Sequence, residues 1–266
     1  MNRREACAGI ALAALSAPAA VRAADALASD RFMLHSTHVG RDFMIEVTPP
    51  VGAGRPSRRL PAVYALDAGY HVAAPAEAAL QSAGAMAPAF VVAIGYPPGQ
   101  PNTRETDLLH RTHMDGGVRI GGGGAAFEAF IQEELKPAIE ARYPVDPDRS
   151  ILLGHSLAGL FVANVLADRP RAFRAYLMAS PSIWADSRAL SQVRAAAPRG
   201  RGRLAFVTVG GAETPRMKTG VAALWAILGG PGSTFVLRSQ VFPGQTHMSY
   251  YPAFLAAALP AALPSR

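Results

Sequence analysis

Residues 151–160 read ILLGHSLAGL, and this stretch decides the fold. An aliphatic, strand-like run ends at Gly154, Ser156 follows in a short turn, and an apolar helical stretch continues from Leu160. A strand, a sharp turn and a helix with serine at the apex form an elbow that strains a nucleophilic serine and needs small residues two before and two after it. Those residues are Gly154 and Ala158, with alanine where a second glycine is usual. The sequence therefore predicts a nucleophile elbow at Ser156.

Outward from the elbow, short aliphatic or β-branched runs alternate with longer helical ones, which is the pattern of an α/β protein. The first two strands are close in sequence and should form an antiparallel hairpin, whereas the later strands, separated by helix-length segments, should be parallel. We predict strands near residues 32–37, 42–48, 61–66, 89–95, 150–154, 175–179, 204–209 and 235–242. We predict helices near residues 72–82, 125–141, 157–168, 187–196, 216–228 and 250–259.

One domain over residues 24–266 accounts for this pattern, because no repeat or linker divides it. The Pro/Gly/Arg stretch 49–59 and the glycine-rich stretch 116–124 are expected to be loops inside that domain. No Gly-Lys-Ser/Thr follows the second stretch, which argues against a phosphate cradle.

The composition is that of a folded, basic protein. Of 266 residues, 50% are hydrophobic and 17% charged, which supplies a core and argues against a disordered chain. The formal net charge of +7 raises the question of nucleic-acid binding. The arginines are scattered singly along the chain without interleaved aromatics, so no nucleic-acid partner is expected. A basic enzyme with an anionic small-molecule substrate fits the charge equally well.

The start of the chain has the pattern of an export signal. Arg3 and Arg4 precede an apolar, alanine-rich stretch over 6–20, and small residues suitable for cleavage end at Ala23. Residues 1–23 are therefore predicted to be a signal peptide that is removed, through either the general or the twin-arginine route, which places the protein in the periplasm or outside the cell. No later run is long enough to span a bilayer. The single cysteine, Cys7, leaves with the leader, which excludes disulfides and thiol chemistry.

A serine hydroxyl needs a base, and the base needs an acid that fixes its tautomer. His247 is the only histidine after Ser156, and three acidic residues lie between the two: Asp168, Asp186 and Glu213. Glu213 follows the C-terminal end of the predicted strand 204–209, where catalytic groups gather in a parallel sheet. We therefore predict Glu213 as the acid, with Asp186 as the reserve and a bare serine–histidine pair as the alternative; Asp168, at a helix end, is disfavoured.

An oxyanion requires two backbone N–H donors. One is predicted to be Leu157, the residue after the serine, and the other Gly69 in the loop 66–71, with Ala68 as its alternative. His155 is expected to point away from the hydroxyl and to be packed. A metal site at His110, His113 and Asp115 is disfavoured because the segment lacks a helical pattern and a glutamate between the histidines, so no metal is predicted.

The order of several motifs resembles the α/β-hydrolase esterases of the enterobactin (trilactone siderophore) esterase type, a group related to S-formylglutathione hydrolases, feruloyl esterases and mycolyltransferases. The resemblance covers the chain from about Phe32 onward, with departures at Ala158 and Ala68 from glycines usual in the family. The motifs are VYALD (63–67), RETD (104–107), the helix 127–143, GHSLAGL (154–160), ASPSIW (179–184) and HMS (247–249).

This resemblance implies an α/β-hydrolase fold, with an eight-stranded, mostly parallel sheet and helices on both faces. It also implies Ser156 as nucleophile, His247 as base, Glu213 as acid and no cofactor. The expected substrate is a carboxylic ester, siderophore lactones first, whose ferric tris-catecholate form is an anion that suits a cationic protein. Acyl transfer to an alcohol or sugar, as in mycolyltransferases, and a non-catalytic ligand-binding protein are the alternatives.

Three side chains are candidates for substrate binding. Arg104 stands in the RETD motif and could hold an anionic group, although it could instead pair with Asp107 to brace a loop. Tyr70 and Trp184 could line an acyl or aryl pocket, or serve only in packing. The oligomeric state is left open.

Overall fold

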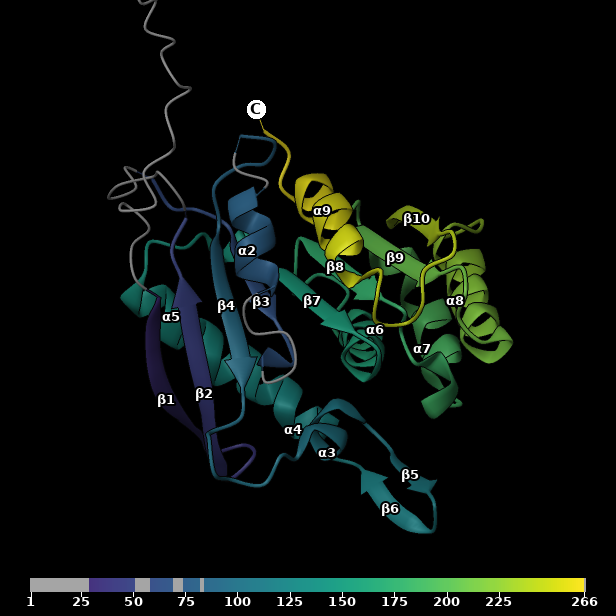
Figure 1. The fold of residues 1–266 in the computed structure, drawn as a ribbon, viewed down its shortest axis with the longest axis horizontal. Coiled ribbons are helices and arrows are strands. Elements are labelled where there is room, and N and C mark those ends of the chain that lie inside the picture. The colour runs from purple at the N-terminus through teal and green to yellow at the C-terminus, as the bar shows by residue number, and fades with distance from the viewer. Residues whose placement is uncertain (1–28, 51–57, 69–73, 82–83, 266) are drawn as a thin grey trace, which may run out of the picture.

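The computed structural model describes residues 29–50, 58–68, 74–81 and 84–265. The predicted leader over 1–23 and the predicted site residues Gly69 and Tyr70 lie outside these described residues. Within them, a large central sheet is flanked by helices, and a small hairpin extends from one end of the molecule (Figure 1).

The central sheet has eight strands in the order β1-β2-β4-β3-β7-β8-β9-β10. The pairings of β2 with β1 and with β4 are antiparallel, and every pairing from β4 to β10 is parallel. The predicted eight-stranded, mostly parallel sheet is therefore confirmed. The strands are β1 (Asp30–Ser36), β2 (Arg41–Thr48), β4 (Phe90–Gly95), β3 (Ala62–Ala65), β7 (Ile151–His155), β8 (Ala175–Ala179), β9 (Leu204–Gly210) and β10 (Val236–Phe242).

Burial explains why the strands differ in sequence. Every residue of β3, β7, β8 and β9 is buried, because helices cover both faces of a parallel sheet and each face must be apolar. Side chains of β3 alternate between the two faces: Ala62 and Tyr64 join one core cluster, Val63 and Ala65 the other. The edge strand β1 instead alternates between exposed and less exposed positions.

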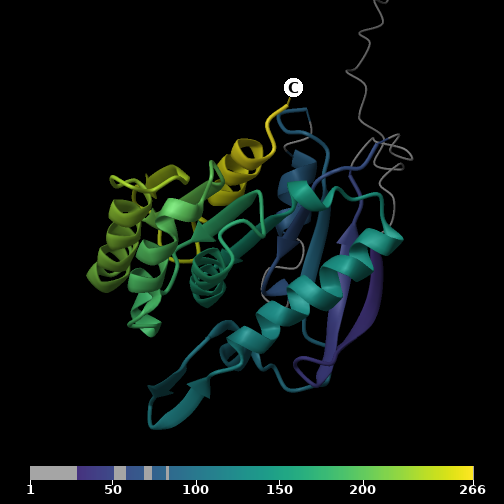
Figure 2. The same cartoon turned by 180° about the vertical axis from the view of Figure 1, so that it is seen from behind.

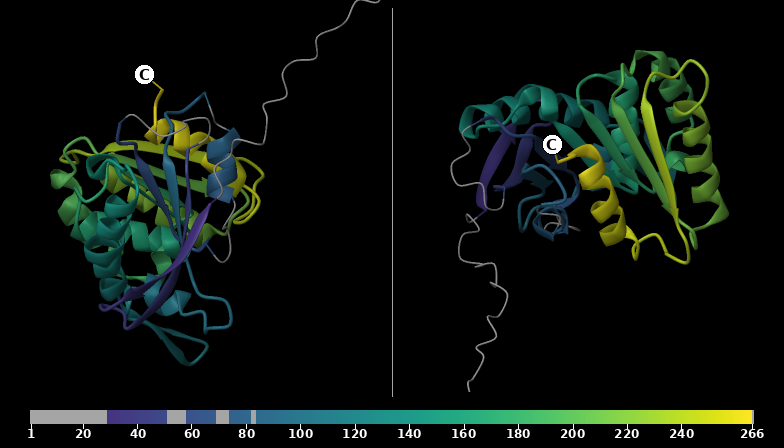
Figure 3. Two further views of the ribbon diagram at one scale, coloured as in Figure 1. Left: turned by 90° about the vertical axis from the view of Figure 1, so that its left-hand side faces the viewer. Right: turned by 90° about the horizontal axis from the view of Figure 1, so that it is seen from above.

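Helices form a layer on each face of the sheet (Figure 3). In the described residues, no helix is both long and apolar enough to cross a membrane. The larger layer contains α4 (Gly124–Ala129), η2 (Phe130–Leu135), α5 (Lys136–Arg142), α6 (Leu157–Asp168), α7 (Ala189–Ala196) and α8 (Pro215–Leu228), and the smaller layer contains α2 (Ala74–Gln81) and α9 (Tyr251–Ala262).

Elements α4, η2 and α5 follow one another as a single long rod across the sheet (Figure 2), where one helix over 125–141 is predicted. The apolar residues at helical spacing are buried, as the pattern requires. The middle of the rod, η2, is a π-helix, which the pattern does not predict. Pro137 in the next turn has no N–H to donate to an α-helical acceptor, which is consistent with a wider turn before it.

A hairpin corrects the prediction for the glycine-rich stretch. β5 (Thr112–Asp115) and β6 (Val118–Gly121) pair antiparallel where a loop over 116–124 is expected, and α4 begins at Gly124. Gly116 and Gly117 join the strands with φ of 54° and 85°. Two consecutive positive φ angles are what a two-residue hairpin turn requires, and glycine meets that demand without strain. The helix α3 (Arg104–Leu108) is likewise absent from the sequence prediction.

Candidate active site

Ser156 lies in the sharp turn between β7 and α6, at φ 62° and ψ −119°. Two backbone hydrogen bonds hold the turn: the Ser156 N–H donates to Ala179 O at 2.9 Å, and the Ser182 N–H donates to Ser156 O at 3.0 Å. A non-glycine residue in such a conformation costs about 1–3 kcal/mol and persists only where the surroundings impose it. The structure therefore confirms the predicted elbow.

Three strained residues follow three neighbouring parallel strands. Asp67 after β3, Ser156 after β7 and Ser180 after β8 have φ of 62°, 62° and 40°. Because these strands are adjacent and parallel, all three residues lie at the same edge of the sheet. Backbone strain concentrates at functional sites, so this edge is the candidate site.

Close packing of β7 on α6 depends on glycine. A Cβ atom placed on Gly154 would lie 2.4 Å from the carbonyl oxygen of Ala158 and 3.0 Å from its Cβ. A Cβ atom on Gly159 would lie 3.0 Å from Ala179 O and from Pro181 Cα. The alanine at 158 is therefore accommodated because the residue opposite it, Gly154, has no side chain.

Glu213 and His247 are brought together from different elements. Glu213 follows β9, His247 follows β10, and His247 Nδ1 lies 2.7 Å from Glu213 Oε2. Backbone bonds hold the two loops together, because Ala212 N–H donates to Gln245 O at 2.9 Å. A Cβ atom on Gly210 would lie 2.6 Å from the same Gln245 oxygen, so this approach also requires glycine.

A hydrogen-bond chain holds the second oxygen of Glu213. Oε1 accepts from Ser180 Oγ and from the Gly210 N–H, the latter at 2.8 Å. Ser180 has one hydroxyl proton and gives it to Glu213, so Tyr250 must donate in the 2.7 Å bond between Tyr250 OH and Ser180 Oγ. Burial raises the pKa of Tyr250, which keeps its phenol protonated and able to donate.

These contacts also set the ionisation of Glu213. Burial alone would raise the pKa of Glu213, but the hydrogen bonds from His247, Ser180 and the Gly210 N–H together outweigh it and lower the pKa. The carboxylate is therefore ionised at neutral pH, and an ionised carboxylate can only accept hydrogen bonds. His247 Nδ1 must then carry a proton, which leaves Nε2 as the acceptor of a neutral ring.

His155 contacts His247, the predicted base, whereas the sequence predicts only a packed residue at this position. Its Nε2 donates to the backbone carbonyl of His247 at 2.9 Å, and the two ring centroids are 4.5 Å apart. His155 is buried, as expected for a packed residue. Because it directly precedes Ser156, it places the imidazole of His247 beside the nucleophile elbow.

The hydroxyl of Ser156 is within 3.3 Å of Ser182 Oγ, and in the described residues this is its hydrogen-bond partner rather than His247. Catalytic hydrogen bonds are often incomplete without substrate. Leu157 begins α6, and the first N–H groups of a helix have no acceptor inside it, so its N–H is available to an oxyanion. The second predicted donor, Gly69, lies outside the described residues, and its alternative Ala68 is buried just beyond β3.

Arg104 lies at the same edge but has a different partner from the one considered. Its Nε donates to Asp67 Oδ1 at 2.7 Å, whereas Asp107 forms its ion pair with Arg41. The alternative prediction, in which Arg104 pairs with Asp107 to brace a loop, is therefore wrong. Asp67 and Asp107 are both buried, and a buried carboxylate needs a partner of opposite charge, so each of the two forms an ion pair with a different arginine. Arg104 instead holds Asp67, the residue before Ala68, which is the alternative for the second oxyanion donor.

Trp184 lies two residues beyond Ser182 and is 40% exposed. The guanidinium carbon of Arg216, in the first turn of α8, lies 4.4 Å from the centre of its ring. The ring of His113 on β5 lies edge-on at 6.3 Å. Trp184 is therefore an exposed aromatic with a cation on its face, and not a core residue.

The remaining acids do not reach His247. Asp186 accepts a hydrogen bond from Arg111 Nε at 3.2 Å, and Asp168 lies 3.8 Å from His110 Nε2.

The described residues with metal-ligand spacing are His110, Glu128 and Asp168, and His110 Nε2 lies 3.2 Å from Glu128. His113 is not one of them; it lies against Trp184. The side chain of Asp115 lies outside the described residues. Arg169 Nε lies 3.1 Å from Glu128, so a guanidinium supplies the positive charge there.

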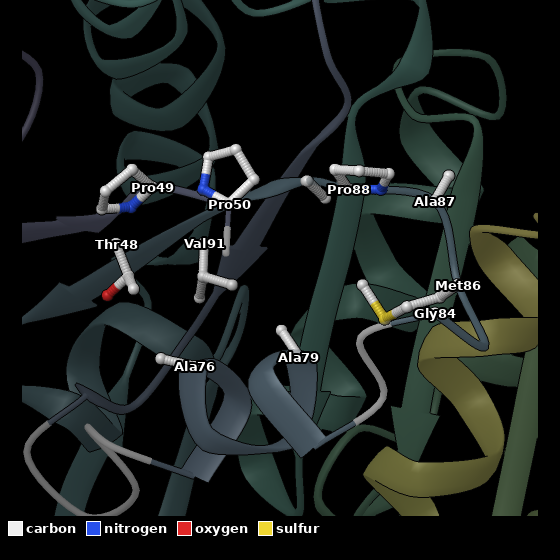
Figure 4. A pocket seen from close by; sticks show the side chains of 11 residues that line it. Thr48, Pro49, Pro50, Ala76, Ala79, Gly84, Met86, Ala87, Pro88 and Val91 are labelled. Carbon is white, nitrogen blue, oxygen red and sulfur yellow. The ribbon is translucent and has the colours of Figure 1, made fainter. Parts of the chain in front are cut away.

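A hollow of about 60 Å³ lies elsewhere, between α2, β4 and the end of β2 (Figure 4). Its walls are mainly alanine and proline, with Thr48, Met86 and Val91, and none of the described residues that line it is titratable (Figure 4). Ligand pockets usually measure several hundred Å³. This hollow is a packing feature.

Comparison with known proteins shows the family of this chain. A family model described as "Putative esterase" matches residues 36–263. The ferri-bacillibactin esterase BesA of Bacillus subtilis (strain 168) is 36% identical over 171 residues, or 57% of this chain and 57% of its own length. The siderophore triacetylfusarinine C esterase of Aspergillus fumigatus is 35% identical over 173 residues, or 60% of this chain and 57% of its own length. The chain thus spans little more than half of each of these relatives.

The fold is shared more fully than the sequence. The crystal structure of the BES protein from Bacillus cereus superimposes with a TM-score of 0.80 at 26% identity, covering 89% of this chain and 95% of that one. The predicted α/β-hydrolase fold is confirmed by this likeness and by the strand order.

Proposed function

Because the chain belongs to the esterase family, we propose that it is a serine esterase that hydrolyses carboxylic esters through an acyl-enzyme. The observation that carries this proposal is the 2.7 Å contact between His247 and the ionised Glu213 at the strand edge that presents the strained Ser156. A protein that only binds its ligand has no need of this pairing.

The mechanism follows from the donors and acceptors. Ser156 Oγ turns from Ser182 toward His247 Nε2, gives up its proton there and attacks the ester carbonyl carbon. The Leu157 N–H donates to the resulting oxyanion. The ester C–O bond then breaks and the alcohol leaves with the proton from His247. Water attacks the acyl-enzyme and loses a proton to Nε2. The bond between the acyl carbon and Ser156 Oγ then breaks, Oγ takes that proton back from Nε2, and the carboxylic acid is released. Glu213 keeps the Nδ1 proton in place throughout.

Ser156→Ala tests the proposal. The variant should lose hydrolysis of a short p-nitrophenyl ester by at least about a thousandfold, because alanine has no hydroxyl to form the acyl-enzyme. It should also lose covalent labelling by a fluorophosphonate probe. Ser191→Ala, an exposed serine on α7, is the matched control and should keep both. Normal hydrolysis by Ser156→Ala would overturn the assignment.

We propose a siderophore ester as the substrate. The two relatives compared above carry siderophore esterase names, and Trp184 with Arg216 offers an aromatic face and a cation two residues beyond Ser182, whose hydroxyl contacts Ser156. An indole ring with a guanidinium on its face suits a planar, anionic acyl group. Trp184→Ala and Arg216→Gln should raise KM for siderophore lactones while leaving kcat for acetate esters unchanged, with Arg238→Gln on β10 as control. Equal effects on both substrates would count against this role.

Export through residues 1–23 is a further part of the proposal, supported by the paired arginines and the alanine-rich stretch that follows them. N-terminal sequencing of the protein recovered from an export-competent host should give Ala24 as the first residue. An intact N-terminus would overturn it.

A further inference from the structure

A hollow of about 650 Å³ lies at the edge of the sheet opposite the candidate active site. It is formed by the segment between α6 and β8 and the segment before β9. These segments enter β8 and β9 at their N-terminal ends, whereas Ser180 and Gly210 leave the same strands at the other end. The length of β9 alone, about 20 Å at 3.3 Å per residue, separates the two sites.

Arginine dominates this hollow. Five guanidinium groups face a single carboxylate, that of Asp168, so positive charge is in large excess. Its charged side chains are Asp168, Arg169, Arg171, Arg199, Arg201 and Arg203.

Two of these arginines stabilise the fold through contacts with neighbouring groups. Arg169 contacts Glu133 at 3.2 Å and Glu128 at 3.1 Å. Arg199 donates to Ala167 O at 3.2 Å, one of the free carbonyl groups at the end of α6. Ion pairing therefore explains Arg169 and helix capping explains Arg199. Neither explains the other three arginines, which are Arg171, Arg201 and Arg203.

The remaining arginines are available to a ligand. Arg171 and Arg201 are exposed, and Arg203 Nε is a buried donor that has no hydrogen-bond partner within the described residues. A buried donor without a partner is costly, and an oxyanion that draws the Arg203 guanidinium toward the hollow would relieve that cost. The main chain around Arg201 is fixed, because its N–H donates to Thr234 Oγ1 at 2.9 Å and the Gly202 N–H donates to Thr234 O at 2.7 Å.

From this arrangement we propose that the hollow is a second binding site, for a ligand carrying two or more phosphate groups. Guanidinium groups match phosphate oxygens in paired hydrogen bonds, and several arginines around one hollow suit several phosphates. The phosphates belong to a free polyphosphate or to a phospholipid headgroup. The site is independent of ester hydrolysis, since none of its residues contacts Ser156, Glu213 or His247 among the described contacts.

Calorimetry with inorganic triphosphate tests the site on the full chain. We expect saturable binding to wild type and a dissociation constant raised at least about tenfold in Arg201→Gln/Arg203→Gln, since each charge-assisted hydrogen bond is strong. Arg171→Gln/Arg201→Gln changes only exposed side chains and should weaken binding without any risk to folding. Both variants should keep wild-type hydrolysis of a p-nitrophenyl ester.

A control variant that loses the same number of positive charges distinguishes a specific binding site from general electrostatic attraction of triphosphate to the protein. Arg58→Gln/Arg238→Gln removes two exposed arginines away from the hollow and should leave triphosphate binding within about twofold of wild type. Flotation with phosphatidylglycerol vesicles, with and without triphosphate, identifies the source: vesicle binding displaced by triphosphate supports a lipid headgroup, and triphosphate binding alone supports a free ligand. Absence of saturable triphosphate binding, or equal weakening in the control, would overturn the proposal.

Discussion

His155, directly before the proposed nucleophile Ser156, contacts the proposed base: His155 Nε2 donates to the carbonyl oxygen of His247 at 2.9 Å, and the two ring centroids lie 4.5 Å apart. The loop after β10 is thereby tied to the end of β7. The position of the imidazole relative to Ser156 thus depends on a contact between side chain and main chain as well as on Glu213.

Replacing His155 with phenylalanine keeps a ring and removes this donor. We expect kcat to fall about fivefold, the equivalent of one hydrogen bond of about 1 kcal/mol, while KM changes little because His155 does not face the substrate. His155→Gln retains an N–H donor and should recover part of the loss. Steady-state kinetics on a p-nitrophenyl ester decide the matter, and a phenylalanine variant as fast as wild type would exclude a positioning role.

The chain from Tyr250 through Ser180 to Glu213 should behave as one unit. Ser180→Ala deprives the carboxylate of a donor and is expected to lower kcat about tenfold and the free energy of unfolding by about 1–3 kcal/mol. Tyr250→Phe should have a smaller effect of the same sign. Because the two residues share a bond, the double variant should cost less than both singles added, by at least about 0.5 kcal/mol. Strict additivity in urea unfolding would show that the hydroxyls act separately.

Acid stability should depend on Glu213. Its pKa is lowered in the folded protein, so ionisation stabilises the fold fully above the unfolded glutamate value of about 4.3, and this stabilisation is lost as the pH falls through the lower folded-state pKa. Glu213→Gln cannot titrate, so its unfolding free energy should decline less steeply on acidification below about pH 5. Urea unfolding between about pH 2 and pH 7 measures the slopes, with Glu105→Gln, an exposed glutamate of α3, as the matched control. Identical slopes for Glu213→Gln and wild type would contradict the linkage.

Gly210 should tolerate no side chain. A methyl group there would lie 2.6 Å from Gln245 O and 3.1 Å from Glu213 Oε1, so the loop carrying His247 must move. We expect Gly210→Ala to lower kcat at least about tenfold and to destabilise the fold by about 1–3 kcal/mol. Kinetics and thermal unfolding measured together check this. A variant with wild-type kcat would mean that the loop adapts without disturbing the imidazole.

Local sequence pattern was sufficient for most elements of the fold. Aliphatic runs such as Ile151, Leu152 and Leu153 indicate strands buried on both faces. The spacing of Phe127, Phe130 and Ile131 indicates the helical rod. The hairpin of β5 and β6 was missed because glycine is common to loops and to tight hairpin turns. Chain order also nominated Glu213 and His247, since few acids and a single histidine follow Ser156.

By itself the sequence determined which side chains are available and where most of the strands and helices lie, because those depend on neighbours within a few residues. Only the tertiary structure decided which distant groups meet. It paired Arg104 with Asp67, attached His155 to the loop of His247, and gathered arginines that are scattered along the chain into one hollow. The physical reason is that adjacent parallel strands bring their starting loops to one edge of the sheet and their ending loops to the other, whatever their separation in sequence.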